Sequence, residues 1–285
     1  MTLLGMGAAA LAFTVPNSSE KKTRGPLPGF QLYSVRKQIA TDLEGTMCKL
    51  AEMGYVGVET YALPEGLALS GAAKVFRDCG LKVFGMHTEL PEGDQCENIM
   101  KMADAYQCDR VVYAGWPAGE KYKDMDAIRK TAEKYDEIAI YLKSRGLRFG
   151  LHNHWWEFEK VDNVYPFYYL LEHASPEIFF EIDTYWTKTA GLDPTKVLRD
   201  FGKRAPFLHI KDGPAIKGDQ AYVQVPAGKG AMDFPAIAAA GGKNTEWMIV
   251  EFDEYAGDIF EGLNSSFRYL ASKGFIQAKE EQQRP

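Results

Sequence analysis

The chain of 285 residues lacks several features that mark common functional classes. It has no excess of positive charge, and its net charge of −6 argues against nucleic acid or an anionic membrane as the main partner. It shows neither closely spaced cysteines nor a zinc signature, so we expect unpaired thiols or packing residues at Cys48, Cys79, Cys96 and Cys108. The segment AGKGA at 227–231 lacks the strand–turn–helix context of a phosphate-binding loop.

The two ends of the chain differ from the rest. Residues 2–15 are apolar and rich in small side chains, like the central region of an export signal, but they follow no basic segment and are too short to span a bilayer. We expect residues 1–25 to be an export-signal remnant or a disordered segment, and residues 279–285 to be a solvated tail. This predicts a periplasmic or exported protein, with a cytoplasmic location as the alternative.

Short β-rich runs alternate with amphipathic helical patterns along the remaining chain. The helical patterns include residues 41–52, 72–78, 125–144 and 194–201, and a glycine often separates helix from strand, as at Gly54 and Gly80. The runs cover residues 29–34, 56–60, 83–87, 110–114, 148–153, 178–182, 206–210 and 247–252. This alternation predicts an α/β fold, a single-domain (β/α)8 TIM barrel over residues 26–278. A doubly wound open sheet is the alternative, but it usually has a Gly-rich first turn.

The segment RFGLHNHWWEF at 148–158 is the most informative part of the sequence. The chain has only five histidines, and two of them, His152 and His154, stand here. Residues two apart on a strand face the same way, so both imidazoles would project from the strand's end. With Glu157 close behind, the pattern indicates a mixed nitrogen and oxygen site for a divalent metal.

The ends of the other runs carry ionisable or aromatic side chains as well, and in a barrel these ends meet at one mouth. They include Tyr33, Glu59, His87, Trp116, Asp183, His209, Lys211 and Glu251. Asp183, His209 and Glu251 form the strongest subset, with Glu157 or a histidine of the fifth run as fourth member. Such a set suits an open site for Mn²⁺, Mg²⁺, Co²⁺ or Zn²⁺ better than it suits a closed structural zinc site.

Several motifs together resemble the xylose isomerase-like TIM-barrel superfamily of sugar phosphate isomerases and epimerases, in particular a bacterial subgroup with His-Asn-His on strand five. They are QLYSVR at 31–36, LHNH at 151–154, EIDTYW at 181–186, HIKD at 209–212, GKGAMDF at 228–234 and VEFD at 250–253. The resemblance implies one divalent metal held by a Glu, an Asp, a His and a Glu from strands five to eight. We expect this metal to be Mn²⁺. Asp183, His209 and Glu251 match the last three. His152 stands where the family has its first Glu, so Glu157 is the expected fourth ligand and His152 the alternative.

The resemblance also implies the chemistry, which is isomerisation or epimerisation of a ketose or keto-sugar through an enediolate. We expect Glu157, Glu251, His152 or His154 to move the proton, and Lys211 to neutralise developing charge. The expected sugar contacts are Tyr33, Glu59, His87, Trp116 and Trp186. The substrate is a small-molecule sugar. Related barrels commonly pair, so a homo-oligomer is an open possibility that the sequence does not decide.

Two other functions stay open. Trp186 occupies a place where epimerases of the family carry a His, which favours as first alternative a metal-dependent lyase or dehydratase that eliminates the β-substituent of 3-keto-glycosides. The second alternative is a sugar-binding barrel without catalysis, which would not need converging metal ligands. Phosphodiester cleavage of abasic DNA, also known in this fold, is disfavoured because the acidic chain lacks a basic groove.

Overall fold

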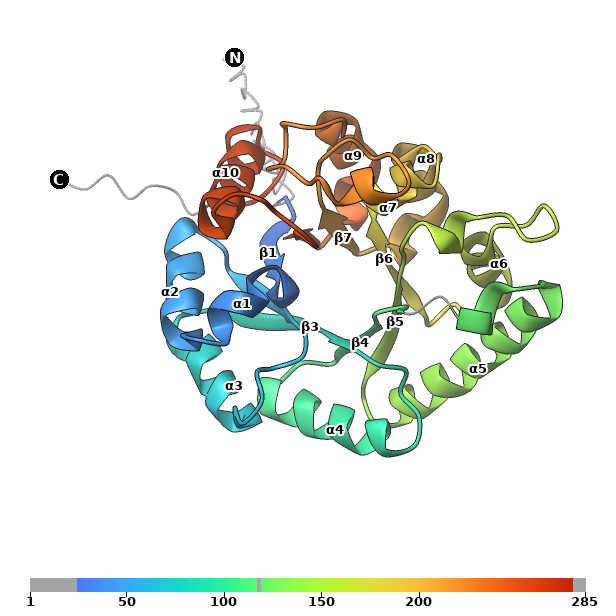
Figure 1. Cartoon of the computed structure of the whole chain (residues 1–285). Helices are drawn as coiled ribbons and strands as arrows, with labels where there is room; N and C mark the ends of the chain where they lie inside the picture. Colours follow the sequence, from blue (N-terminus) through green and yellow to red (C-terminus); the bar gives the residue numbers. More distant parts are fainter. Residues whose placement is uncertain (1–24, 117–118, 279–285) are drawn as a thin grey trace, which may run out of the picture.

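The computed structural model describes residues 25–116 and 119–278, and within them a closed barrel of parallel strands runs in the order β1 to β8. Figure 1 shows the helices arranged as a ring around this barrel. The predicted TIM barrel is thus confirmed. The strands are β1 (Leu27–Gln31), β2 (Gly57–Thr60), β3 (Lys82–Thr88), β4 (Arg110–Tyr113), β5 (Arg148–His152), β6 (Phe179–Asp183), β7 (Phe207–Ile210) and β8 (Trp247–Val250).

The helices fall where the amphipathic patterns predicted them. Gly54 and Gly80 follow α2 and α3 with φ of 113° and 76°, the left-handed conformation that lets the chain leave a helix and enter a strand. The helices are α1 (Arg36–Ile39), α2 (Leu43–Met53), α3 (Leu69–Asp78), α4 (Asp94–Tyr106), α5 (Met125–Ser144), α6 (Pro166–His173), α7 (Thr184–Thr189), α8 (Pro194–Phe201), α9 (Phe234–Gly241) and α10 (Ile259–Ser272).

The first strand differs from its predicted bounds. It ends at Gln31 rather than at residue 34, because the chain turns there into a 3₁₀ helix, Leu32–Val35. The side chain of Gln31 accepts a hydrogen bond from the backbone N–H of Tyr33 and so begins that turn. The turn carries Tyr33 to the mouth of the barrel.

Aromatic side chains close the lower half of the barrel interior. The rings of Phe84 and Trp247, from β3 and β8, stack 3.9 Å apart, and Phe207 of β7 meets Phe84 edge to face at 5.4 Å. Glycines make room for these rings: a Cβ on Gly57 would come within 2.5 Å of Trp247, and one on Gly29 within 2.6 Å of Phe84. This aromatic plug, formed by Phe84, Phe179, Phe207 and Trp247, keeps water out of the barrel from its N-terminal end. Polar groups above the plug therefore lie in a poorly solvated interior.

A layer of polar side chains lies above this plug, and on β6 and β7 it is reached two residues farther along the strand. Phe179 and Phe207 of the plug are followed on the same face of their strands by Glu181 and His209. Both are fully buried, and Glu59 of β2 contacts His209 across the barrel at 2.8 Å. The next residues on the same face lead to the mouth, where the site is built.

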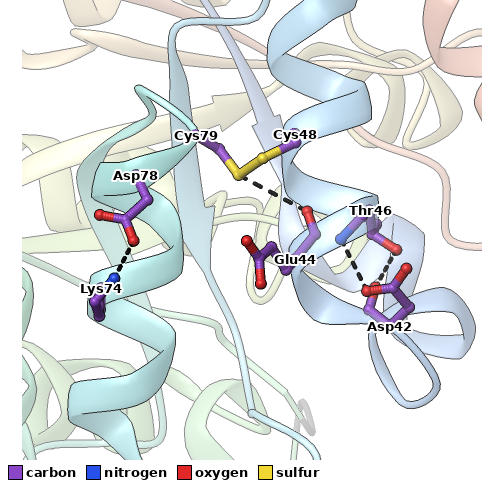
Figure 2. The surroundings of a disulfide bond; sticks show 8 residues. Asp42, Glu44, Thr46, Cys48, Lys74, Asp78 and Cys79 are labelled. Carbon is purple, nitrogen blue, oxygen red and sulfur yellow. Dashed lines mark hydrogen bonds and ion pairs between the residues drawn. A yellow bond between two sulfur atoms is a disulfide. The ribbon is translucent and has the colours of Figure 1, made fainter.

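The prediction of four unpaired cysteines is wrong for two of them. Cys48 of α2 and Cys79 at the end of α3 form a disulfide, with their Cα atoms 4.8 Å apart (Figure 2). The two residues are 31 positions apart in sequence, but consecutive helices of a barrel lie side by side. Cys96 and Cys108 are free, as predicted.

Two predictions concern segments outside the described residues. The expected export-signal remnant at 1–25 lies outside them except for Gly25, and so does the expected tail at 279–285. Among the helices that the structure describes, none combines the length and the apolar character needed to cross a membrane.

Candidate active site

A pocket of about 220 Å³ opens at the C-terminal ends of the strands. Its position agrees with the predicted mouth of the barrel, where the ends of all strands meet. The residues expected at the site that line this pocket are Tyr33, His87, Trp116, His152, His154, Trp186, Lys211 and Glu251. Tyr61, Ala114, Tyr222, Asp253 and Glu254 complete the lining. Tyr222, in the 3₁₀ helix Asp219–Tyr222, and Glu254 were not predicted because they lie outside the motifs; Asp253 ends the VEFD motif but was given no role.

Three further expected residues lie below the pocket lining. Glu59, Asp183 and His209 are 0% exposed and belong to β2, β6 and β7. Glu59 was expected to touch the substrate, but the structure places it in the polar layer, against His209. It therefore acts on the site through that histidine.

Asp183, His209 and Glu251 bring their ligand atoms together in one group that can hold a metal ion. His209 Nδ1 lies 2.6 Å from Glu251 Oε2 and 3.9 Å from Asp183 Oδ2. Although it is fully buried, Nδ1 is not aligned for a hydrogen bond with any described group. A buried imidazole nitrogen that faces two carboxylates at these distances fits a metal ligand.

The other nitrogen of His209 faces the polar layer. Nε2 lies 2.8 Å from Glu59 Oε2 and 3.0 Å from Glu181 Oε1. Although burial opposes it, the carboxylates that face both ring nitrogens hold the pKa of His209 well above its usual range, so the ring carries a charge. A bound cation would take the place of the Nδ1 proton, while the carboxylates of the polar layer keep the proton on Nε2. The carboxylates of Glu59 and Glu181 thus orient the predicted ligand.

Glu181 is the centre of the polar layer, and sequence reasoning missed it. Its Oε1 lies 2.6 Å from His87 Nε2, 3.0 Å from His152 Nδ1 and 3.0 Å from His209 Nε2. These four residues form a second group whose atoms can surround a cation. The signal was available: Glu181 stands two residues before Asp183 and therefore faces the same side of β6.

Burial and mutual charge spread the pKa values in this layer. Burial, with Glu181 nearby, raises the pKa of Glu59 to about 7. Burial lowers the pKa of His152 to about 3, so this imidazole is neutral at neutral pH. For Glu181 burial acts in the opposite sense, but His209 and His87 outweigh it and hold the pKa of Glu181 well below its usual range. Such opposed shifts are typical of active sites.

Neither expected fourth ligand belongs to the Asp183, His209 and Glu251 group. Glu157 is 1% exposed and its Oε2 accepts a hydrogen bond from the backbone N–H of His154 at 2.8 Å. Burial raises the pKa of Glu157 to about 8, which disfavours the ionised form that a metal needs. His152 instead contacts Glu181. A fourth protein ligand remains a prediction.

Lys211 lies between the acidic residues of the site. Its Nζ is 2.8 Å from Asp183 Oδ2, 2.8 Å from Glu251 Oε2 and 3.0 Å from Asp253 Oδ2. Burial alone would disfavour the charged amine, but these carboxylates hold the pKa of Lys211 well above its usual range. It is therefore a buried ammonium with three partners.

Aromatic side chains form much of the pocket wall. Trp116 is 56% exposed and Tyr61 is 36% exposed, so both offer open faces to a ligand. The ring of His154 stacks on Trp156 at 4.2 Å. Trp186 is only 1% exposed and contacts Trp155 and Tyr222, so it supports the wall rather than presenting an open stacking surface.

The segment GKGAM at 228–232 is held by an internal carboxylate. Asp212 accepts hydrogen bonds from the backbone N–H groups of Gly213, Gly228, Gly230 and Met232 at 2.8–3.1 Å. These amides therefore already have an anionic partner. With this partner the amides are not available to a phosphate, and the contacts join two motifs that lie far apart in the sequence.

Comparison with known proteins agrees with this geometry. A family model described as xylose isomerase-like TIM barrel matches residues 48–273. No curated protein shows significant similarity to the chain.

Solved structures share the fold at low sequence identity. A sugar phosphate isomerase/epimerase from Parabacteroides distasonis superposes with a TM-score of 0.74 at 22% identity, over 93% of this chain and 100% of that one. An L-ribulose 3-epimerase gives 0.68 at 16% identity, over 91% and 100%. The probable 3-DHS dehydratase AsbF from Bacillus anthracis gives 0.69 at 13% identity, over 86% and 98%.

Proposed function

Because the chain belongs to the xylose isomerase-like TIM-barrel family, we propose that it is a divalent-metal-dependent isomerase or epimerase of a ketose or keto-sugar. The observation that carries this proposal is the convergence of Asp183, His209 and Glu251 next to an aromatic-lined pocket. Nδ1 of His209 adds a nitrogen ligand to two carboxylates, a set that suits Mn²⁺, with Mg²⁺, Co²⁺ or Zn²⁺ as alternatives.

A divalent ion in this group would polarise the substrate carbonyl and stabilise the charge of an enediolate. The protein's own residues prepare this step. Although burial opposes it, Lys211 and His209 hold the pKa of Glu251 well below its usual range, so the carboxylate is ionised, as a metal ligand must be. Glu59 and Glu181 fix the ring of His209 from below.

His154 is the proposed group that moves the proton of the substrate carbon. It lines the pocket, and burial together with His152 and Lys211 lowers the pKa of His154 well below its usual range. The imidazole is therefore neutral and can accept a proton. An enediolate forming beside it would raise that pKa and favour the transfer, because a nearby negative charge stabilises the imidazolium.

A lyase acting on 3-keto-glycosides is the second candidate. The open faces of Trp116 and Tyr61 at the outer part of the pocket favour a ligand that extends beyond one sugar ring. Such a ligand carries a leaving group at the β-position. Expulsion of that group from the same enediolate gives elimination instead of reprotonation.

One experiment separates these functions. The Mn²⁺-loaded and the metal-stripped protein are incubated in D₂O with ketoses and 3-keto-glycosides, and proton NMR follows the carbon beside the carbonyl. Metal-dependent deuterium uptake with an intact skeleton supports the isomerase, and release of the aglycone supports the lyase. No exchange with any sugar contradicts both and favours a binding barrel.

The metal ligands have their own test. Asp183→Asn and Glu251→Gln remove charged ligands, so we expect both variants to lose bound Mn²⁺ and activity together. Metal analysis of the purified variants by mass spectrometry measures the first effect. Retention of stoichiometric metal in both would contradict the proposed ligand set.

We also propose that the protein works in an oxidising compartment. The Cys48–Cys79 disulfide supports this, because such bonds persist in secreted and periplasmic proteins and are rare in the cytosol. Isolation of the native protein under alkylating conditions measures the state of the two thiols. Fully alkylated Cys48 and Cys79 would favour a cytoplasmic location.

A further inference from the structure

The ammonium of Lys211 contacts both carboxylates of the candidate metal group. Its contacts at 2.8 Å are to Asp183 Oδ2 and Glu251 Oε2, the two oxygens that also face His209 Nδ1. Lys211 is 2% exposed, so this charge is not screened by solvent. The cation of the protein and the cation of the proposed function therefore require the same two oxygens.

Asp183 has little freedom to bind the Lys211 ammonium and a metal ion at the same time. Its second oxygen, Oδ1, accepts a hydrogen bond from the backbone N–H of Trp186 at 2.8 Å and caps α7. The carboxylate cannot turn without losing that cap. A metal ion about 2.1 Å from Asp183 Oδ2 would lie within about 5 Å of the Lys211 nitrogen, where two cations in a poorly solvated site repel strongly.

Lys211 has a place to go. It lines the pocket, and its third partner, Asp253, has a side chain that is 21% exposed and is also part of the pocket lining. Movement toward Asp253 would keep one carboxylate contact while it releases the other two. The amine would then face a bound substrate.

We propose that Lys211 is the built-in counter-cation of the metal-free site, and that metal binding displaces its ammonium from Asp183 and Glu251 into the pocket. The inference rests on the proposed metal dependence. The carboxylates receive the metal only when they release the lysine. The released lysine is then positioned for a substrate oxygen, so the inference joins metal binding by the carboxylates to the predicted role of Lys211 in neutralising charge.

The test compares Mn²⁺ binding by isothermal titration calorimetry in the chelator-treated wild type and in Lys211→Met. Methionine keeps the unbranched shape of the side chain up to Cε and removes the competing charge, so we expect at least about tenfold tighter Mn²⁺ binding. Lys217→Met is the matched control, because Lys217 is 47% exposed and pairs with Glu159 away from the site. Its Mn²⁺ affinity should equal that of the wild type.

The outcomes separate the inference from the proposed function. If the wild type binds no Mn²⁺, the proposed function fails. If the wild type binds Mn²⁺ and Lys211→Met binds it equally or more weakly, the inference is overturned while the proposed function stands.

A second measurement needs no variant and covers the case that Lys211→Met does not fold without metal. The wild type is acetylated briefly with acetic anhydride, with and without Mn²⁺, and Lys211 is quantified by peptide mass spectrometry. Release into the pocket should increase its acetylation several-fold with Mn²⁺, while Lys217 serves as the internal reference. An unchanged ratio of Lys211 to Lys217 would contradict displacement.

Discussion

Removal of the Cys48–Cys79 disulfide should destabilise the protein without changing its chemistry. The bond closes a loop of 31 residues between two neighbouring helices (Figure 2). Opening it restores freedom to the unfolded chain, and the loop-entropy relation gives roughly 3.7 kcal/mol at 25 °C for this length. At about 2 °C per kcal/mol for a domain of this size, Tm should fall by about 7 °C.

Differential scanning calorimetry of the Cys48→Ser/Cys79→Ser double variant measures this loss. Reductant should lower the Tm of the wild type by a similar amount and leave the Tm of the double variant unchanged. Cys96→Ser is the matched control, because Cys96 is free and should respond to reductant as the wild type does. The rate at 25 °C should stay the same in all variants, since neither cysteine of the bond lines the pocket.

The reasoning would be refuted by a Tm change below about 2 °C on reduction of the wild type. That result would mean that the loop is already constrained in the unfolded chain, or that the bond does not form in solution. Titration of free thiols in the unfolded, unreduced protein separates the two. Two reactive thiols indicate that the bond is present, and four indicate that it is absent.

Two further predictions concern the site and its support. His154→Ala should keep bound Mn²⁺ and lower kcat by roughly a hundredfold, the usual size of a general acid–base contribution; loss of the metal in this variant would show that His154 holds it. Glu157→Gln should become more stable relative to the wild type as pH rises from about 5 to 8. The pKa of Glu157 is raised from 4.5 to about 8 by burial, so the unfolded chain loses its proton first and the wild type loses stability across that window. Urea unfolding in chelator at several pH values measures the difference, with the exposed Glu159→Gln as control; a difference that does not vary with pH would contradict the assignment.

The barrel could be predicted because the local sequence pattern of each segment indicates whether it forms a helix or a strand. The helix from Met125 to Ser144 has the predicted bounds, since its amphipathic pattern, an Asp124 cap and a following glycine all agree. The strands were found within a few residues for the same reason. The first strand was misjudged at its end because apolar residues of a 3₁₀ turn, Leu32–Val35, have the same composition as a strand.

The disulfide was missed because spacing in the sequence was taken as the test for a pair. Cysteines 31 positions apart look unrelated in a linear scan. Once a barrel is predicted, however, consecutive helices are neighbours, and Cys48 within α2 can reach Cys79 at the end of α3. The pairing follows from the order of the helices around the barrel and not from the local sequence around either cysteine.

The polar layer shows how far periodicity alone can reach. On β6, residues 179, 181 and 183 face the barrel interior in turn, in the aromatic plug, the polar layer and the metal group. Residues 207 and 209 of β7 and residue 211 just beyond it follow the same alternation. Alternation by two along each strand is therefore enough to place Glu181 beneath Asp183 and Lys211 above His209. It does not predict which side chains meet across the barrel. His87 contacts Glu181 over 94 positions of sequence, and His209 contacts Glu59 over 150. These contacts decide which nitrogen of His209 faces the metal group and which carboxylates are ionised, so the metal group becomes recognisable only when the barrel is closed.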